Sequence, residues 1–146
     1  MHRFGIMLFS SLQMLAVSAR AESLSIEPGQ WKVTATTAIN GGSMPPKVTM
    51  RCLSPEQAGD VTKTLGPEMG TVNSTCGPTQ FETKIGQMKW QLLCRGQIDI
   101  DLVANYTFDS RSHYTATVIS KGWMAGALMS DVRTELEGER TGECQP

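Results

Sequence analysis

The sequence predicts a single, mainly β domain with one antiparallel meander sheet of about seven strands, curled toward a half-open barrel, and one short helix after Cys52. Three observations lead to this prediction. Apolar and polar residues alternate with a period of two over most of the chain. Clusters of Gly, Pro, Asn and Ser separate the alternating runs, and a helix-start signal stands directly after Cys52.

The first two predicted strands are joined by a tight turn. Alternation over residues 31–39 predicts a strand with one buried face. Asn40-Gly41-Gly42 is a turn signal, and Pro45-Pro46 delays the start of the next strand. The returning strand is then predicted over residues 47–53.

The predicted helix follows that strand at once. Ser54 is suited to cap it, Pro55 to occupy its first position, and Gln57 to complete a capping box. Gly66-Pro67 should end the helix after Leu65.

The rest of the chain alternates in the manner of hairpins. Residues 66–78 predict a loop, and residues 122–129 fit either a connection with a buried Trp123 or a broken strand. The later strands are predicted over residues 81–85, 88–94, 97–108, 114–119 and 132–137.

The first 21 residues have the pattern of an export signal. A short basic start precedes an apolar stretch, and Ala19-Arg20-Ala21 forms a small-x-small cleavage site. We therefore expect residues 1–21 to be a signal peptide and residues 22–146 a single disulfide-bonded β-rich domain, periplasmic or secreted. After cleavage, no integral membrane segment is expected.

Four cysteines allow three pairings. Cys76 and Cys94 flank the predicted hairpin at matching distances from its turn, so we expect them to pair, which leaves Cys52 with Cys144. The alternative is a metal site, but the sequence has no C-x-x-C motif. We expect neither a metal nor another cofactor.

The charge pattern excludes one class of partner. Removal of Arg3 and Arg20 leaves 14 acidic residues against fewer basic ones, with no basic cluster. Such a mildly acidic domain is not expected to bind nucleic acid.

Candidate binding residues are aromatic. Gly29-Gln30-Trp31 resembles the G-x-W signature that opens the first strand of lipocalins and other calycins, in which an arginine of the last strand stacks on the tryptophan. Arg140 is the matching arginine here. The alternative role for Trp31 is that of a core residue. The expected ligand face consists of Trp31, Trp90, Tyr106, Trp123 and Arg140.

Catalytic constellations are weak by comparison. Asp99 and Asp101 alternate with inward-facing apolar residues, so we expect them to face solvent. His113 stands at a predicted turn, without a G-x-S-x-G motif in the sequence. We therefore expect a protein that is not an enzyme.

A longer series of residues resembles a known family. Gly29-Gln30-Trp31, the Met44-Pro45-Pro46 turn, the stretch from Cys52 to Ala58 (CLSPEQA) and Gly142-Glu143-Cys144 are similar, in order, to the DUF3617 family. Its members are small exported proteins of Gram-negative bacteria, and the family has no established activity. The resemblance implies location, cysteine bonding and fold.

Two functions remain open from the sequence. One is a non-catalytic protein that binds a small apolar ligand on the curved sheet. The other is a structural or interaction protein of the cell envelope that uses an exposed sheet face or edge to contact another protein.

Overall fold

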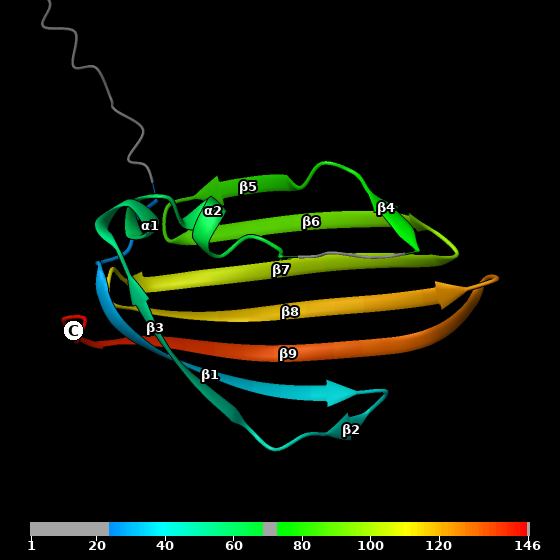
Figure 1. Cartoon of the computed structure of the whole chain (residues 1–146), viewed down its shortest axis with the longest axis horizontal. Helices are drawn as coiled ribbons and strands as arrows, with labels where there is room; N and C mark the ends of the chain where they lie inside the picture. The colour runs from blue at the N-terminus through cyan, green and yellow to red at the C-terminus, as the bar shows by residue number, and fades with distance from the viewer. Residues whose placement is uncertain (1–23, 69–72, 146) are drawn as a thin grey trace, which may run out of the picture.

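The computed structural model describes residues 24–68 and 73–145 (Figure 1). The predicted signal peptide lies outside these residues. The described part of the chain forms one antiparallel sheet of nine strands, with two short helices against one end of its concave side (Figure 1). The mainly β fold and the single open sheet agree with the sequence prediction.

The strands differ greatly in length. Four long strands, β1 and β7–β9, make up most of the sheet, whereas β2 and β4 are short additions at its margins. In chain order the elements are β1 (Gly29–Ile39), β2 (Gly42–Ser43), β3 (Lys47–Leu53), α1 (Pro55–Gly59), α2 (Val61–Thr64), β4 (Ser74–Cys76), β5 (Gln80–Lys84), β6 (Gln87–Gly96), β7 (Ile98–Ser110), β8 (His113–Met124) and β9 (Ala127–Gly142).

The strand order departs from a simple meander. Strands β5 to β9 follow one another as hairpins, but β1 then pairs with β9, so the first and last long strands are neighbours. The order is β2-β1-β9-β8-β7-β6-β4, with β3 also on β1 and β5 also on β6. In the described residues β3 and β5 do not pair, and the sheet stays open between them.

Two tight turns have left-handed residues. Asn40 and Gly41 have φ of 50° and 83°, and Ala125 and Gly126 have φ of 50° and 79°. In a two-residue hairpin turn, positive φ at both turn residues matches the right-handed twist of the two strands that the turn joins. The second turn settles the ambiguous stretch over residues 122–129, which forms the end of β8 and the start of β9.

The single predicted helix is divided into two. The capping box is present, since Ser54 Oγ accepts from Gln57 N at 3.2 Å and Gln57 Oε1 accepts from Ser54 N at 2.9 Å. Asp60 then leaves the helical conformation, with φ of −124° and ψ of 79°, and its carboxylate accepts from Lys63 N. An aspartate that caps a new helix ends the one before it.

Both helices pack on the sheet through a few apolar residues. Ala58 and Val61 are each 1% exposed, and Ile26 N donates to Ala58 O at 3.0 Å, which ties the segment before β1 to the first helix. The structure contains two disulfides, Cys52–Cys144 and Cys76–Cys94, in the pairing expected from the sequence.

Candidate ligand-binding trough

Three of the expected ligand-face residues are buried in the core. Trp31, Trp90 and Tyr106 are only 1%, 4% and 6% exposed. Tyr114 lies between them, with its ring centroid 5.6 Å from Trp31 and 5.7 Å from Tyr106. These four aromatic residues, together with α1 and α2, form what we call the closed end, and they are buried too deeply to form an exposed ligand face.

The polar atoms of the two buried tryptophans are already used. Trp31 Nε1 donates to the carbonyl of Glu27 at 2.9 Å, and Trp90 Nε1 donates to the carbonyl of Leu65 at 2.9 Å. Because a buried N–H needs a partner, these bonds fix the segment before β1 and the end of α2 onto the sheet. The tryptophans therefore hold the closed end together.

The buried tyrosines are neutral packing groups. Burial raises the pKa of Tyr106 and of Tyr114 above the ordinary value of 10.0, so both phenols stay protonated at physiological pH. Tyr114 also lies over Gly138, its partner on β9, where a Cβ atom would collide with the tyrosine ring. Glycine at 138 is therefore required for the ring to pack flat on the sheet.

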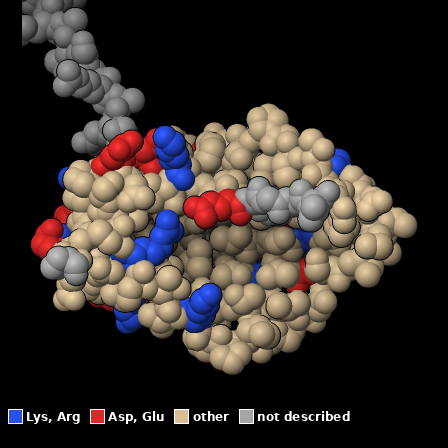
Figure 2. All heavy atoms as spheres, in the orientation of Figure 1, with Lys and Arg blue, Asp and Glu red and all other residues tan. Residues whose placement is uncertain are grey.

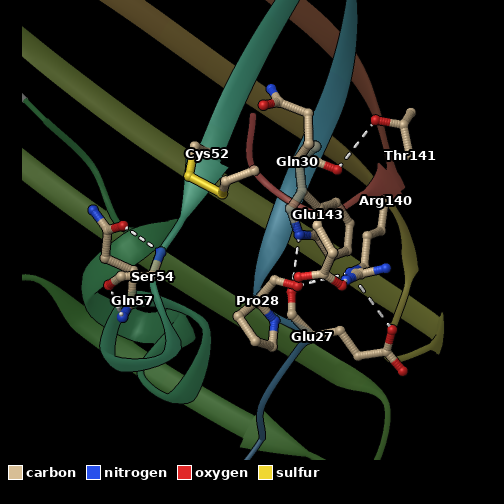
Figure 3. Close-up of a disulfide and its surroundings, with 11 residues drawn as sticks. Glu27, Pro28, Gln30, Cys52, Ser54, Gln57, Arg140, Thr141 and Glu143 are labelled. Atoms are coloured by element: carbon tan, nitrogen blue, oxygen red, sulfur yellow. Dashed lines mark hydrogen bonds and ion pairs between the residues drawn. A yellow bond between two sulfur atoms is a disulfide. The ribbon is translucent and has the colours of Figure 1, made fainter. Parts of the chain in front are cut away.

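Arg140 is a structural tie at the same end (Figure 3). It is the register partner of Trp31 on β9, but its guanidinium Nε donates to the Pro28 carbonyl at 2.7 Å. The guanidinium also pairs with Glu143, and its Nε lies 3.7 Å from Glu27 Oε2. Its observed bonds therefore join the segment before β1 to the end of β9.

Gly29 explains why the G-x-W motif begins with glycine. Its φ is +130°, and a Cβ there would come within 2.9 Å of the Arg140 Nε. Only glycine tolerates both the dihedral angle and the approach of the guanidinium.

Trp123 is separated from the other expected residues. It is the register partner of Asp99, whereas the neighbouring Gly122 is the partner of Ile100, which packs on the core. Since successive side chains of a strand point to opposite faces, Trp123 lies on the convex face. The five expected ligand-face residues are therefore not brought together.

In the described residues, the concave face of β1, β8 and β9 is open beyond the closed end, whereas that of β6 and β7 is buried core as far as Cys94. Beyond the closed end, side chains of β1, β8 and β9 alternate onto the open part, and most of them are half-buried. We call this region the trough; it is formed by Val33, Ala35, Thr37, Ile39, Val118, Ser120, Val132, Thr134 and Leu136. Figure 2 views the molecule from the same side as Figure 1 and shows a hollow whose visible floor is mostly uncharged.

The trough contains no charged residue. Its polar groups are hydroxyls, and two of them satisfy each other, since Thr37 Oγ1 and Thr134 Oγ1 lie 3.1 Å apart. At the far end of β1 the side chain of Ile39 is 42% exposed. These residues are not predicted as a site from the sequence. The period-two pattern marks them as inward-facing, but it does not indicate which part of the sheet the helices cover.

The convex face holds the charges of the central strands. Arg95 Nη1 lies 2.6 Å from Asp101 Oδ1, and Lys121 Nζ lies 3.4 Å from Asp131 Oδ2. His113 Nδ1 lies 2.9 Å from Asp109, and its Nε2 lies 3.2 Å from Glu137. Hydrogen bonds to these two carboxylates raise the pKa of His113.

Cavities among the described residues also lie outside the trough. One of about 290 Å³ lies where β5, β6 and β7 meet, and another of about 330 Å³ lies beside the Cys52–Cys144 disulfide. Both are lined largely by polar side chains. The first is lined by Glu82, Lys84, Gln87, Met88, Lys89, Asn105, Tyr106 and Thr107, and the second by Gln30, Met50, Thr141, Glu143 and Gln145.

Metal-binding groups and membrane-spanning helices are absent from the described ranges, 24–68 and 73–145. There, three or more His, Cys, Asp or Glu side chains do not come together in a group that would hold a metal ion. None of the helices described has the length and apolar character needed to cross a membrane.

Comparison with known proteins finds one family. The family model described as "Protein of unknown function (DUF3617)" matches residues 26–144, which include every strand and helix of the fold. No curated protein and no solved structure matches the chain.

Proposed function

This chain belongs to the DUF3617 family, and from that premise we propose that it is a non-catalytic binding protein of an oxidising compartment outside the cytoplasm, with an elongated apolar molecule held in the trough. The observation that carries the proposal is the partial second layer. A β-sheet normally buries its apolar face against another element, and among the described residues α1 and α2 pack only at one end of the concave face. A bare apolar surface of this kind is typical of a binding site.

The shape of the trough favours a long, thin ligand. From Val33 to Ile39 the first strand extends for about 20 Å at the usual rise per residue. Its side chains are aliphatic or carry hydroxyls, and the trough has no carboxylate, histidine or free thiol to take part in acid–base or nucleophilic chemistry. These features favour an acyl chain or a similar hydrocarbon as a bound molecule rather than as a substrate.

The compartment is inferred from the cross-links and from the sequence of the first 21 residues. Two disulfides in one small domain are typical of proteins outside the reducing cytoplasm. Periplasmic or secreted location is therefore part of the proposal. Fractionation of cells that express the full chain tests it, because the processed protein should appear outside the cytoplasm, beginning after Ala21.

The binding test uses two neighbours on β8. Val118 and Ile119 are both half-buried, but Val118 faces the trough and Ile119 the convex face. Binding of the neutral fluorescent probe N-phenyl-1-naphthylamine should be lost in Val118→Asp and kept in Ile119→Asp, because an apolar probe in the trough would have to desolvate the new carboxylate.

A second pair keeps the test valid if Val118→Asp fails to fold. Ile39 is 42% exposed at the open end of the trough, and Ala38 is its convex neighbour. We expect Ile39→Asp to weaken probe binding and Ala38→Asp to leave it unchanged. Equal binding by folded trough and convex variants would exclude the trough as the site.

The alternative function, contact with another envelope protein, is favoured by one observation. Val48 and Met50 on the convex side of β3 are 54% and 53% exposed, and in the described residues β3 pairs on one edge only. Native mass spectrometry of protein purified gently from its own cells distinguishes the two functions. A retained small molecule supports the trough, and a retained protein supports the edge.

A further inference from the structure

Two cations stand beside the trough on the edge strand β3. Lys47 is the register partner of Ala35, and Arg51 is the register partner of Trp31. Partners directly opposite in an antiparallel pair project from the same face, so both cations project from the concave face. Thr49, the partner of Val33, lies between them on that face.

These cations have no protein counter-ion. Within residues 24–68 and 73–145, neither Lys47 nor Arg51 forms an ion pair or a side-chain hydrogen bond. By contrast, three cations of the convex face, Arg95, Lys121 and Arg133, each pair with a carboxylate. Both β3 residues are exposed, so each can still form ion pairs or hydrogen bonds with a ligand.

Arg51 is also directed toward the interior of the curve. Its positive charge acts on the phenols of Tyr106 and Tyr114, which lie on β7 and β8 at the closed end. The register with Trp31 places Arg51 on the concave side at the closed end, and Lys47, opposite Ala35, stands beside the trough.

We propose that Arg51 and Lys47, with the Thr49 hydroxyl between them, bind the anionic head group of an acyl ligand whose tail lies in the trough toward Ile39. This inference rests on the proposed function and adds the ligand class, an anionic amphiphile. The charge complementarity is specific to this rim, because Arg140, the other cation on the concave side of the long strands, is already paired with Glu27 and Glu143. A carboxylate or a phosphate satisfies the same donors.

The first experiment compares three ligands with the same tail. Palmitate, hexadecanol and hexadecylamine are titrated into the purified, oxidised mature domain by calorimetry below their aggregation concentrations. Palmitate should bind about tenfold more tightly than hexadecanol, and hexadecylamine more weakly than either. Raising the salt concentration should reduce the preference for palmitate, since exposed charges are screened.

Charge reversal locates the head-group site. In the double variant Lys47→Glu with Arg51→Glu, hexadecylamine should become the preferred ligand, a gain that an unfolded protein could not show. The matched control, Lys32→Glu with Lys89→Glu, changes the same net charge on the convex face and should keep the preference for palmitate. The affinity for lysophosphatidylglycerol is then compared with that for palmitate, which distinguishes a phospholipid from a free fatty acid as the source of the anion. Zwitterionic lysophosphatidylcholine is the control for the net charge of the head group.

The outcomes separate this inference from the proposed function. Equal affinity for palmitate and hexadecanol, or a preference unchanged by charge reversal on β3, would overturn the head-group site and leave the apolar trough intact. If none of the three ligands binds, both the trough and the head-group site are wrong.

Discussion

The closed end and the trough are two regions of one concave face with the same alternating pattern, but only the first is buried. At the closed end, four aromatic residues are buried in one core cluster with Ala58 of α1 and Val61 of α2; they are Trp31, Trp90, Tyr106 and Tyr114. In the trough, smaller side chains of β1, β8 and β9 have no described element over them (Figure 2). The difference shows that an inward-facing apolar residue becomes core only where the chain supplies a second layer.

Both disulfides restrain the sheet, but they differ in the length of chain that they close. Cys52–Cys144 joins residues 92 apart beside the closed end, and Cys76–Cys94 joins residues 18 apart. Replacement of both cysteines of each bond by serine should lower the free energy of unfolding by about 4–5 kcal/mol for the first and about 3 kcal/mol for the second. Urea denaturation of the two variants measures both free energies of unfolding and so shows which loss is larger. The reverse order would show that strain or residual structure outweighs loop length.

Truncation of one side chain in each region tests the contrast directly. Trp31→Ala should lower the free energy of unfolding by about 3–5 kcal/mol because it opens a large cavity in the closed end. Ile39→Ala in the trough should cost no more than about 1 kcal/mol, since Ile39 is already 42% exposed. Similar costs from denaturant unfolding would mean that the trough is packed as tightly as the closed end.

A single methyl group probes how closely the closed end is packed. Gly138→Ala places a Cβ against the Tyr114 ring and should destabilise the fold by about 1–3 kcal/mol. Gly126→Ala, at a turn where a Cβ meets no neighbouring atom, is the control for loss of glycine; its φ of 79° adds backbone strain without a collision. In Gly138→Ala the near-ultraviolet circular dichroism of the aromatic cluster should also change, whereas in Gly126→Ala it should not.

The smallest effect is expected outside both regions, at His113. The carboxylates of Asp109 and Glu137 raise its pKa in the folded state above the ordinary value of 6.5. Protonated His113 therefore stabilises the folded state through these two carboxylates. This contribution to the free energy of unfolding is fully present below pH 6.5 and is lost as the pH rises through the raised folded-state pKa. His113→Gln should flatten this part of the stability profile slightly. An NMR titration that finds the His113 pKa at or below 6.5 would contradict the contacts.

Much of the fold could be predicted because local signals determine it. The capping box of Ser54 and Gln57 and the turn at Asn40-Gly41 each depend on neighbouring residues alone. The break at Asp60 was missed although aspartate is a common N-cap, because Ala58, Val61 and Leu65 keep a helical spacing across it.

The candidate site could not be predicted in the same way. Trp123 was expected on the ligand face, but the sequence over residues 122–129 fitted either a connection or a broken strand, and only the register with Asp99 places Trp123 on the convex face. The pairing of β1 with β9, and the position of α1 and α2 over Trp31, depend on contacts between residues far apart in the sequence. The division of one face into a closed end and a trough is therefore a property of the tertiary structure.

The most direct test of this division is methyl NMR during titration with palmitate. If the ligand lies in the trough, the methyl resonances of Val33, Val118 and Leu136, which line it, should shift on addition of palmitate. The methyl groups of Val61 and Leu65 in the closed end, and of Val103 and Ile119 on the convex face, should stay in place. Shifts confined to the closed end or the convex face, or no shift at any methyl group, would contradict binding in the trough.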